Sequence, residues 1–324
     1  MAKRDEDRVS GKILVVDDQP LNVELLEADL LEYGYEVVTA YDGVTALEKV
    51  TRDLPDLILL DVMMPGMDGF EVCRRLKGNQ ETVLVPIVMI TALSEKADRI
   101  KGIEAGVDDF LTKPYDRQEL QARVKSLLRV KHYTDELERA EAVIASLALG
   151  VEAKDSYTEN HCERLSRYSV SLGKKFNLPA EQLRALKLGG TLHDVGKIGI
   201  PDAILNKKGR LTEDEYSVMR QHPIIGYNIC KPLRSLRHVL PIIRHHHERL
   251  DGTGYPDGLA GEDIPLTARI LTVVDVYDAL RTERPYKPAY DHDKAMKIIH
   301  EETAKGWYDL KVVDKFKDLH LEAR

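Results

Sequence analysis

Cysteine is scarce in this sequence, and the cysteines it has are far apart. Cys73, Cys162 and Cys230 are the three thiols of a 324-residue chain, and none belongs to a CxxC pair. This spacing argues against a disulfide framework and against a zinc site built from thiolates. It fits the reducing cytoplasm, where we expect the protein to be found.

An excess of positive charge and long apolar runs are also lacking. The net charge of -8 argues against binding to bulk nucleic acid or to an anionic membrane, although a local basic pocket could still hold a small phosphate ligand. The longest apolar run, LVPIVMITAL, has roughly half the length of a membrane-spanning helix. The N-terminal MAKRDEDRVSGK lacks the apolar core of a signal peptide. We therefore expect no nucleic-acid partner and no membrane.

The first 130 residues alternate short apolar, β-rich runs with amphipathic segments. Segments such as LNVELLEADLLEYG have apolar residues at the i, i+3, i+4 spacing of a helix. Continuously apolar strands separated by helices predict a doubly wound α/β domain, a five-stranded parallel sheet covered on both faces. Sites in such sheets lie at the carboxyl ends of the strands. The expected strands cover residues 12–16, 35–40, 56–60, 83–90 and 106–112.

The remaining sequence predicts helices throughout. From Pro114 to about Asp155 there is no strand pattern, and residues 131–152 are expected to form a helical linker. Apolar residues recur there at alternating spacings of four and three, which predicts either a short coiled coil that pairs two chains or a stripe that packs against one domain. Beyond residue 155 the pattern is all-α. The stripe consists of Tyr133, Leu137, Ala140, Ile144, Leu147 and Val151.

Reactive side chains follow four of the five expected strands. Asp17 and Asp18 follow the first strand, Asp61 the third, Thr91 the fourth and Lys113 the fifth. Carboxylates that converge at strand ends make an oxygen site suited to Mg²⁺. A lysine and a hydroxyl nearby suit a transferred phosphoryl group, for which Asp61 could be the nucleophile. A single such aspartate would more often be a helix cap, but the whole set favours a site.

The stretches ILVVDD, LLDVMMPGMDG, MITAL and FLTKP resemble a two-component receiver domain, and the match covers residues 11–130. The resemblance implies a flavodoxin-like fold and phosphorylation of Asp61 by a cognate histidine kinase. It implies that Asp17 and Asp18 hold Mg²⁺ and that Thr91 and Lys113 contact the phosphoryl group. Phe110 would occupy the family's aromatic switch position.

Histidines and carboxylates in the second half suggest a different metal chemistry. Without thiolates they suit Fe, Mn or Zn, and they are numerous enough for two metals, an arrangement used to cleave phosphate esters. Each alone is weak, because a lone histidine is more often a satisfied or surface residue. Asp275 is more telling, since a carboxylate within an apolar helix needs a partner. The features are His161, His193–Asp194, His222, the run His245–His246–His247, and Asp275.

The stretches HDVGKIGIPDAIL, HHERLDGTGYPDGL and IPLTARILTVVDVYDALRTERPYK resemble the HD-GYP phosphodiesterases, a branch of the HD hydrolase superfamily. The resemblance implies an all-helical domain over residues 153–324 that hydrolyses cyclic di-GMP to pGpG, with further cleavage to GMP left open. Tyr157 stands where members with three metals have a glutamate, so two divalent metals, Fe or Mn, are expected. The implied ligands are His161, His193, Asp194, His222, His246, His247 and Asp275.

The resemblance also assigns roles around the metals. Lys197 would bind the scissile phosphate and, with Asp194, belong to the catalytic residues. Arg284 and Lys287 are candidates for the second phosphate, and Tyr255 for contact with guanine or a partner protein. Successive helical residues are about 100° apart, so three adjacent histidines cannot all face one cluster. Helical geometry leaves two neighbouring pairs open, and the HHERxDGxGYP register chooses His246 and His247.

These observations predict a response regulator whose phosphorylation alters cyclic di-GMP hydrolysis. Two alternatives are a cyclic di-GMP sensor or docking module without turnover, and an HD hydrolase of another cyclic dinucleotide. The complete set of expected ligands favours an enzyme. Expected partners are cyclic di-GMP, a histidine kinase, a second copy of the chain paired through the linker, and diguanylate cyclases.

Overall fold

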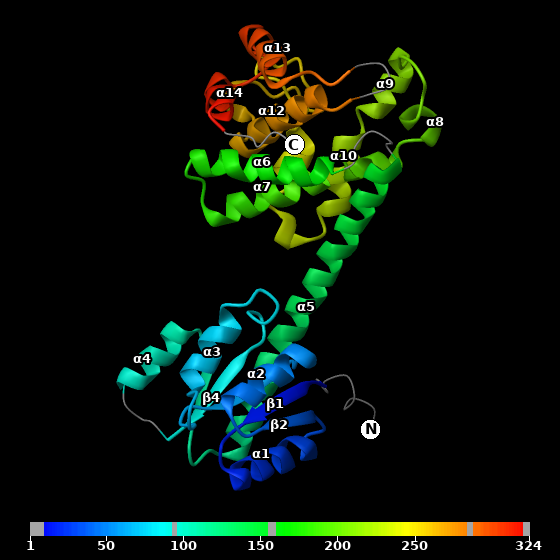
Figure 1. Cartoon of the computed structure of the whole chain (residues 1–324). Coiled ribbons are helices and arrows are strands. Elements are labelled where there is room, and N and C mark those ends of the chain that lie inside the picture. Colours follow the sequence, from blue (N-terminus) through cyan, green and yellow to red (C-terminus); the bar gives the residue numbers. More distant parts are fainter. Residues whose placement is uncertain (1–9, 93–95, 155–159, 284–287, 320–324) are drawn as a thin grey trace. The chain divides into compact units, whose positions relative to one another are not determined.

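The computed structural model describes residues 10–92, 96–154, 160–283 and 288–319. The chain divides into two compact units, Met1–Glu136 and Leu137–Arg324, each treated by itself below (Figure 1). Helix α5 runs through the division. The expected domain limits, 11–130, 131–152 and 153–324, therefore stay a prediction, because no break in secondary structure marks them.

The first unit is built on a five-stranded parallel sheet, which confirms the predicted fold. The strand order β2-β1-β3-β4-β5 places the first strand inside the sheet, so the order reverses beside it. The strands are β1 (Lys12–Val16), β2 (Glu36–Ala40), β3 (Leu57–Asp61), β4 (Ile87–Thr91) and β5 (Asp109–Thr112).

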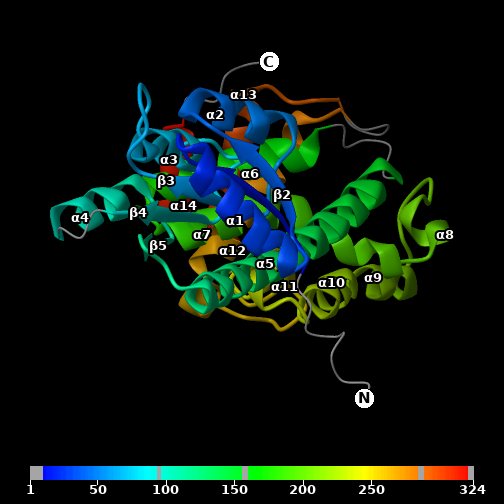
Figure 2. The same cartoon turned by 90° about the horizontal axis from the view of Figure 1, so that it is seen from below.

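Helices cover both faces of this sheet, and alternate residues along each strand face opposite sides. Leu14 and Val16 of β1 belong to the core under α2, α3 and α4, whereas Ile13 and Val15 face the core under α1 and α5. In both views α4 lies at the outer edge of the unit, next to β4 (Figure 1, Figure 2). The helices are α1 (Pro20–Glu32), α2 (Gly43–Arg52), α3 (Gly69–Lys77), α4 (Lys96–Ala105) and α5 (Arg117–Lys154).

Two expected strands begin later than their apolar sequence indicates. Residues 83–86 form turns, with the Val85 amide donating to the Thr82 carbonyl, and β4 begins only after Pro86. Proline has no N–H to donate to a neighbouring strand, so Pro86 marks the point before which the central strand cannot extend. Before β5, Gly106 has a φ of +90°, a left-handed conformation that closes α4 and delays the strand.

The second unit is helical, as predicted, and its described residues contain no β-strand apart from an isolated bridge between Asp251 and Ala260. Its α-helices are α6 (His161–Lys175), α7 (Ala180–Leu192), α8 (Asp202–Leu205), α9 (Glu213–Met219), α10 (His222–Cys230), α11 (Leu240–His245), α12 (Leu266–Arg281), α13 (His292–Ala304) and α14 (Leu310–Lys317). Short 3-10 turns are η1 (Val195–Gly199), η2 (Arg234–Leu236) and η3 (Gly261–Asp263).

Helix α12 runs through the core of this unit. Ile270, Leu271 and Val274 on it are fully buried and pack with apolar residues of α6, α7 and α11. Four histidine-bearing segments lie at helix termini around this core: His161 begins α6, His193 follows α7, His222 begins α10 and His246 follows α11. Because these helices pack around α12, their ends lie close together. Polar residues that are far apart in the sequence therefore meet at one place.

The apolar stripe of α5 is divided between two environments. Ile144 packs against the core of the second unit, as the packing interpretation expects, and Val151 is buried. Tyr133 and Leu137 are exposed instead, with 58% and 47% of their surface accessible. The exposed part stays available for the coiled-coil interpretation. Among the described residues, no helix is both long and apolar enough to span a membrane.

Candidate functional site

The second unit gathers all seven side chains expected to be metal ligands. His161 begins α6, His193 and Asp194 follow α7, His222 begins α10, His246 and His247 follow α11, and Asp275 lies within α12. Their donor atoms form two groups, each with every atom within 4.8 Å of the others. One group is Asp194, His222, His246 and His247; the other is His161, His193 and Asp275.

Asp194 connects the two groups. Its Oδ1 lies 3.1 Å from Nε2 of His222, whereas its Oδ2 lies 3.3 Å from Nε2 of His193. One oxygen therefore faces each group, which is the placement of a carboxylate that bridges two metals. Burial opposes the ionisation of Asp194, yet the charges of Lys197 and His193 lower its pKa well below the ordinary value. The carboxylate is thus held in its anionic, metal-binding form.

The histidine rings are oriented so that their Nε2 atoms act as ligands. Nδ1 lies 2.8 Å from the Met219 carbonyl in His222 and 2.9 Å from the Ile243 carbonyl in His246. Since a carbonyl accepts a hydrogen bond, the proton sits on Nδ1 and leaves Nε2 with a lone pair. Yet Nε2 of His222 lies only 3.4 Å from Nε2 of His246. A cation held between these two atoms would satisfy both lone pairs.

Buried polar atoms in the same place support a metal. Nε2 of His193 and Oδ1 of Asp194 are buried and have no hydrogen-bond partner among the described residues. Burial lowers the pKa of His246 and His247, helped by the neighbouring histidines, so these rings stay neutral. Neutral imidazole is the form that binds metal. At the other group, burial opposes a charge on His193 but Asp194 raises the pKa of this ring, so a metal there would replace the proton that Asp194 favours. With that exchange the donor set fits a divalent metal at each group.

Two further residues support this cluster. Asp278 lies one helical turn after Asp275, a spacing that from sequence leaves open a supporting role or a solvated residue, whereas Arg164 was not identified from sequence. Oδ2 of Asp278 lies 2.7 Å from Nδ1 of His161, and Arg164 donates from Nε to Oδ1 at 2.6 Å. Asp278 is buried, while Asp275, the carboxylate expected to be buried, keeps 22% of its side chain exposed. Arg164 lies three residues after His161, one helical turn away, and that spacing is the only sequence feature that points to it.

Lys197 lies at the cluster, as expected. Its Nζ is 2.7 Å from Oδ2 of Asp194, the oxygen on the His193 side. Tyr255 stacks on His247, with ring centroids 4.7 Å apart and planes 26° from parallel. Arg284, Lys287 and Tyr157 lie outside the described residues.

A hollow of about 320 Å³ opens beside the metal ligands. Tyr216 and Arg220 from the end of α9 line it, although neither was identified from sequence. The hollow borders one edge of the ligand cluster and is rich in polar side chains. His246, His247, Asp275 and Tyr255 are also among its lining residues.

His245 faces away from the two ligand groups. The helix ends at this residue, and its Nδ1 lies 3.4 Å from Oδ2 of Asp257. Buried Glu248 holds the adjacent loop by accepting hydrogen bonds from the amides of Asp257, Gly258 and Leu259. This arrangement agrees with the choice of His246 and His247 over His245.

The first unit brings three of its expected site residues into direct contact. Nζ of Lys113 lies 2.6 Å from Asp17 and 2.5 Å from Asp61. Burial opposes the charge on Lys113, but these carboxylates raise its pKa. For Asp61, burial raises the pKa, and the nearby charge of Lys113 partly opposes this rise. The Met63 amide donates to Asp61 and fixes the carboxylate at the end of β3.

The other expected residues surround this point. Asp18 is half-buried next to Asp17, and Thr91 is buried at the end of β4. Phe110 lies on β5 against α4: a Cβ added to Gly102 would come within 2.4 Å of its ring.

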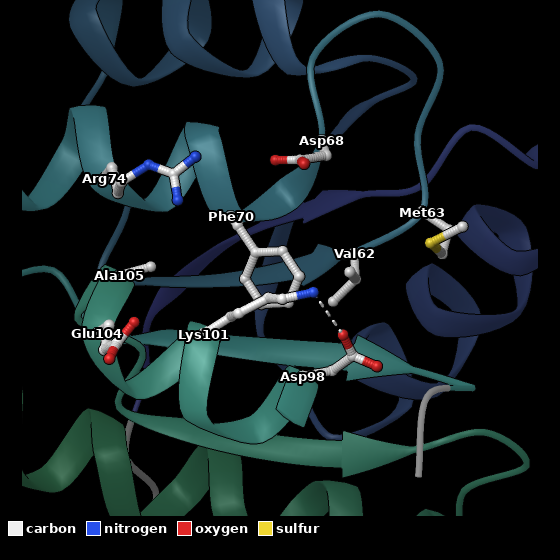
Figure 3. Close-up of a pocket in the computed structure, with 9 residues that line it drawn as sticks. All are labelled: Val62, Met63, Asp68, Phe70, Arg74, Asp98, Lys101, Glu104 and Ala105. Atoms are coloured by element: carbon white, nitrogen blue, oxygen red, sulfur yellow. Dashed lines mark hydrogen bonds and ion pairs between the residues drawn. The ribbon is translucent and has the colours of Figure 1, made fainter. Parts of the chain in front are cut away.

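A second hollow, of about 590 Å³, lies between α3 and α4, beside the residues that follow Asp61. Figure 3 shows Phe70 reaching into it from α3, with the Asp98–Lys101 ion pair of α4 on the other side. The pair is exposed and 3.2 Å long. An exposed pair of this kind contributes little to stability.

Comparison with known proteins agrees with both halves of this description. A family model described as "Response regulator receiver domain" matches residues 13–125, and one described as "HD domain" matches residues 144–312. The chain therefore belongs to the family of response regulators that join a receiver domain to an HD domain.

Curated relatives match this chain over most of its length or over part of it. The "Cyclic di-GMP phosphodiesterase response regulator RpfG" of Xanthomonas campestris pv. campestris is 37% identical over 93% of this chain and 86% of that protein. A "Cyclic di-GMP phosphodiesterase" of Thermotoga maritima is 32% identical over 96% of this chain and 90% of that protein. "Response regulator PleD" of Caulobacter vibrioides is 60% identical over 41% of this chain and 30% of that protein.

Proposed function

We propose that the protein is a metal-dependent phosphodiesterase that hydrolyses cyclic di-GMP to linear pGpG, under control of phosphorylation at Asp61. The observation that carries this proposal is the pair of ligand groups sharing Asp194, with its two oxygens facing different groups. The choice of cyclic di-GMP as substrate rests on relatives that are named cyclic di-GMP phosphodiesterases and that this chain matches over most of their length.

The residues would divide the reaction between them. His222, His246, His247 and Asp194 would hold one metal, and His161, His193, Asp275 and the other oxygen of Asp194 a second. Two divalent metals, Fe or Mn, would supply a nucleophile from water near neutral pH and neutralise charge on the phosphate. The water oxygen bonds to phosphorus as the bond from phosphorus to the 3′ oxygen breaks, and that oxygen takes up a proton.

Lys197 is the protein's own cation at this point. Its contact with Asp194 places the ammonium beside the metal ligands, where a scissile phosphate would carry growing negative charge. A fixed cation there stabilises the transition state more than the ground state. Asp278 and Arg164 would keep His161 in the tautomer and orientation that bind metal.

The receiver unit would regulate this activity. Asp17, Asp18 and Asp61 form an oxygen-rich end of the sheet suited to Mg²⁺, and Lys113 is positioned to pair with a phosphoryl group on Asp61. Thr91 would hydrogen-bond that group, and Phe110 would respond to it from β5. A cytoplasmic histidine kinase is the expected donor. Two chains would pair through the exposed part of α5, and diguanylate cyclases would be further partners.

Product analysis tests the proposal. The purified protein loaded with Mn²⁺ should convert cyclic di-GMP to pGpG, whereas a His193→Ala, Asp194→Ala variant should not. His238→Ala is the matched control, because this histidine pairs with Glu181 outside the ligand groups. Equal turnover by the double variant would contradict the proposed centre. Wild-type protein that binds the dinucleotide without cleaving it would support a sensor instead.

A further inference from the structure

The hollow beside the ligand groups has one wall that the proposed chemistry does not use. Tyr216 lies within α9, Arg220 directly follows this helix, and Tyr255 lies in the loop after α11. The three side chains reach the hollow from segments more than thirty residues apart in sequence. None of them belongs to either metal-ligand group.

Arg220 is held between two aromatic rings. Its guanidinium carbon lies 4.5 Å from the ring centre of Tyr216 and 5.1 Å from that of Tyr255. Tyr255 in turn stacks on His247, 4.7 Å between ring centres. A continuous series of rings therefore joins this arginine to the metal ligands. Contacts of this kind fix a guanidinium in place while leaving the N–H groups at its edge able to donate.

The positive charge of Arg220 is not neutralised by a carboxylate in the described part of the chain. No ion pair or hydrogen bond is found for its side chain there, unlike Arg244, which donates twice to Asp257. Arg220 is exposed to solvent at the hollow rather than buried. Aromatic faces attract a cation but carry no net charge, so the arginine remains a site for an anion.

The anion must also satisfy the geometry of the guanidinium. With ring faces on its flanks, Arg220 donates in its own plane, which matches two oxygens of a phosphate in a forked arrangement. A cyclic dinucleotide has two phosphates, and the ligand groups can take only the one that is cleaved. Arg284 and Lys287, the candidates that the resemblance gives for the second phosphate, lie outside the described residues. Among the described residues, Arg220 and Arg249 are the lysine or arginine side chains that line the hollow, and of these Arg220 contacts Tyr255, which stacks on a metal ligand.

We propose that Arg220, positioned by Tyr216 and Tyr255, binds the phosphate of the cyclic dinucleotide that is not cleaved. This inference rests on the proposed function and makes Arg220 a substrate-specificity residue. It also gives the tyrosine of the GYP loop a role: its ring supports the arginine on one side and the ligand His247 on the other.

Two substrates separate the second phosphate from the bases. Cyclic di-GMP has two phosphates, whereas the linear dinucleotide GpG has both guanosines and a single phosphate. In Arg220→Ala we expect KM for cyclic di-GMP to rise by roughly ten- to a hundredfold with kcat unchanged, as for a lost charge-assisted hydrogen bond. For GpG, the KM as a substrate or the inhibition constant as a competitive inhibitor should not change. Arg220→Lys, which keeps the charge without the fork, should fall between.

Arg210→Ala is the matched control, since this exposed arginine precedes α9 and does not line the hollow. Metal content of each variant should equal that of wild type. An unchanged KM for cyclic di-GMP in Arg220→Ala would overturn the inference and leave the proposed function standing. An equal loss for GpG would overturn it too, because the contact would then be with a base. If wild-type protein neither binds nor cleaves cyclic di-GMP, both proposals fall.

Discussion

Asp278 illustrates which single residues sequence reasoning can and cannot assign. The resemblance of short motifs supplied seven ligands, and the structure brings all seven into two groups. Asp278 and Arg164 are 114 residues apart in sequence, and the contacts of Asp278 with Arg164 and His161 exist only because α12 packs on α6. A motif records residue types along the chain, not which helices become neighbours. Arg220 was not identified from sequence for the same reason, because its contact with Tyr255 joins two segments that are far apart in the chain.

Asp278→Asn should weaken metal binding by about 10- to 100-fold, the effect typical of losing a residue that orients a ligand. The amide keeps the size of the side chain but loses the charge that pairs with Arg164 and orients His161. Titration of metal-free protein with Mn²⁺ measures the change. Asp293→Asn, an exposed residue at the start of α13, is the control. An affinity equal to that of wild type would show that Asp278 has no part in the site.

At the scale of elements, the sheet and most helices followed from apolar periodicity, but boundaries did not. The apolar run before Pro86 was expected to be strand, and it forms turns because proline cannot join the ladder and local amides pair among themselves. Likewise, one continuous stripe on α5 lies in two environments. Periodicity identifies a face of a helix, whereas the partner of that face depends on tertiary packing.

The loop that carries Tyr255 should depend on Glu248. This buried carboxylate accepts three backbone hydrogen bonds, and Glu248→Gln would turn an acceptor into a donor facing an amide. We expect the variant to lose about 1–3 kcal/mol of unfolding free energy. Urea unfolding followed by the fluorescence of Trp307 is the measurement. Glu262→Gln, exposed in the same loop, should behave as wild type. Identical midpoints for both variants would contradict this role.

The exposed part of α5 should pair two chains. Val130, Tyr133 and Leu137 expose apolar surface along one helix, and charged residues there should prevent association. Sedimentation of wild type should give a dimer, and Tyr133→Glu, Leu137→Glu a monomer. Arg139→Glu is the control on the same helix. A wild-type monomer, or a dimer that survives both changes, would contradict pairing through this segment.

For the molecule as a whole, one helix belongs to both units: α5 completes the sheet core of the receiver unit and packs on the core of the HD unit. A continuous helix that shifts or rotates as a body carries a change at one end to the other end. Phosphorylation of Asp61 is the event expected to start such a change. The family assignment agrees with this organisation.

Acetyl phosphate should label the wild-type protein at Asp61 in the presence of Mg²⁺. Asp61→Asn should take up no label, because the nucleophilic carboxylate is lost while Lys113 and Asp17 remain. Asp53→Asn, an exposed residue that pairs with Lys12, should be labelled like wild type. Intact mass spectrometry provides the readout. Labelling of Asp61→Asn at the wild-type level would place the phosphorylation site elsewhere.

In the proposed centre, two metals share Asp194. Metal-free protein should regain cyclic di-GMP hydrolysis as Mn²⁺ is added, with ions per chain and turnover measured on the same samples. We predict that activity rises with occupancy and levels off at about two ions per chain. Full activity at one ion, or a requirement for three, would contradict a centre of two metals.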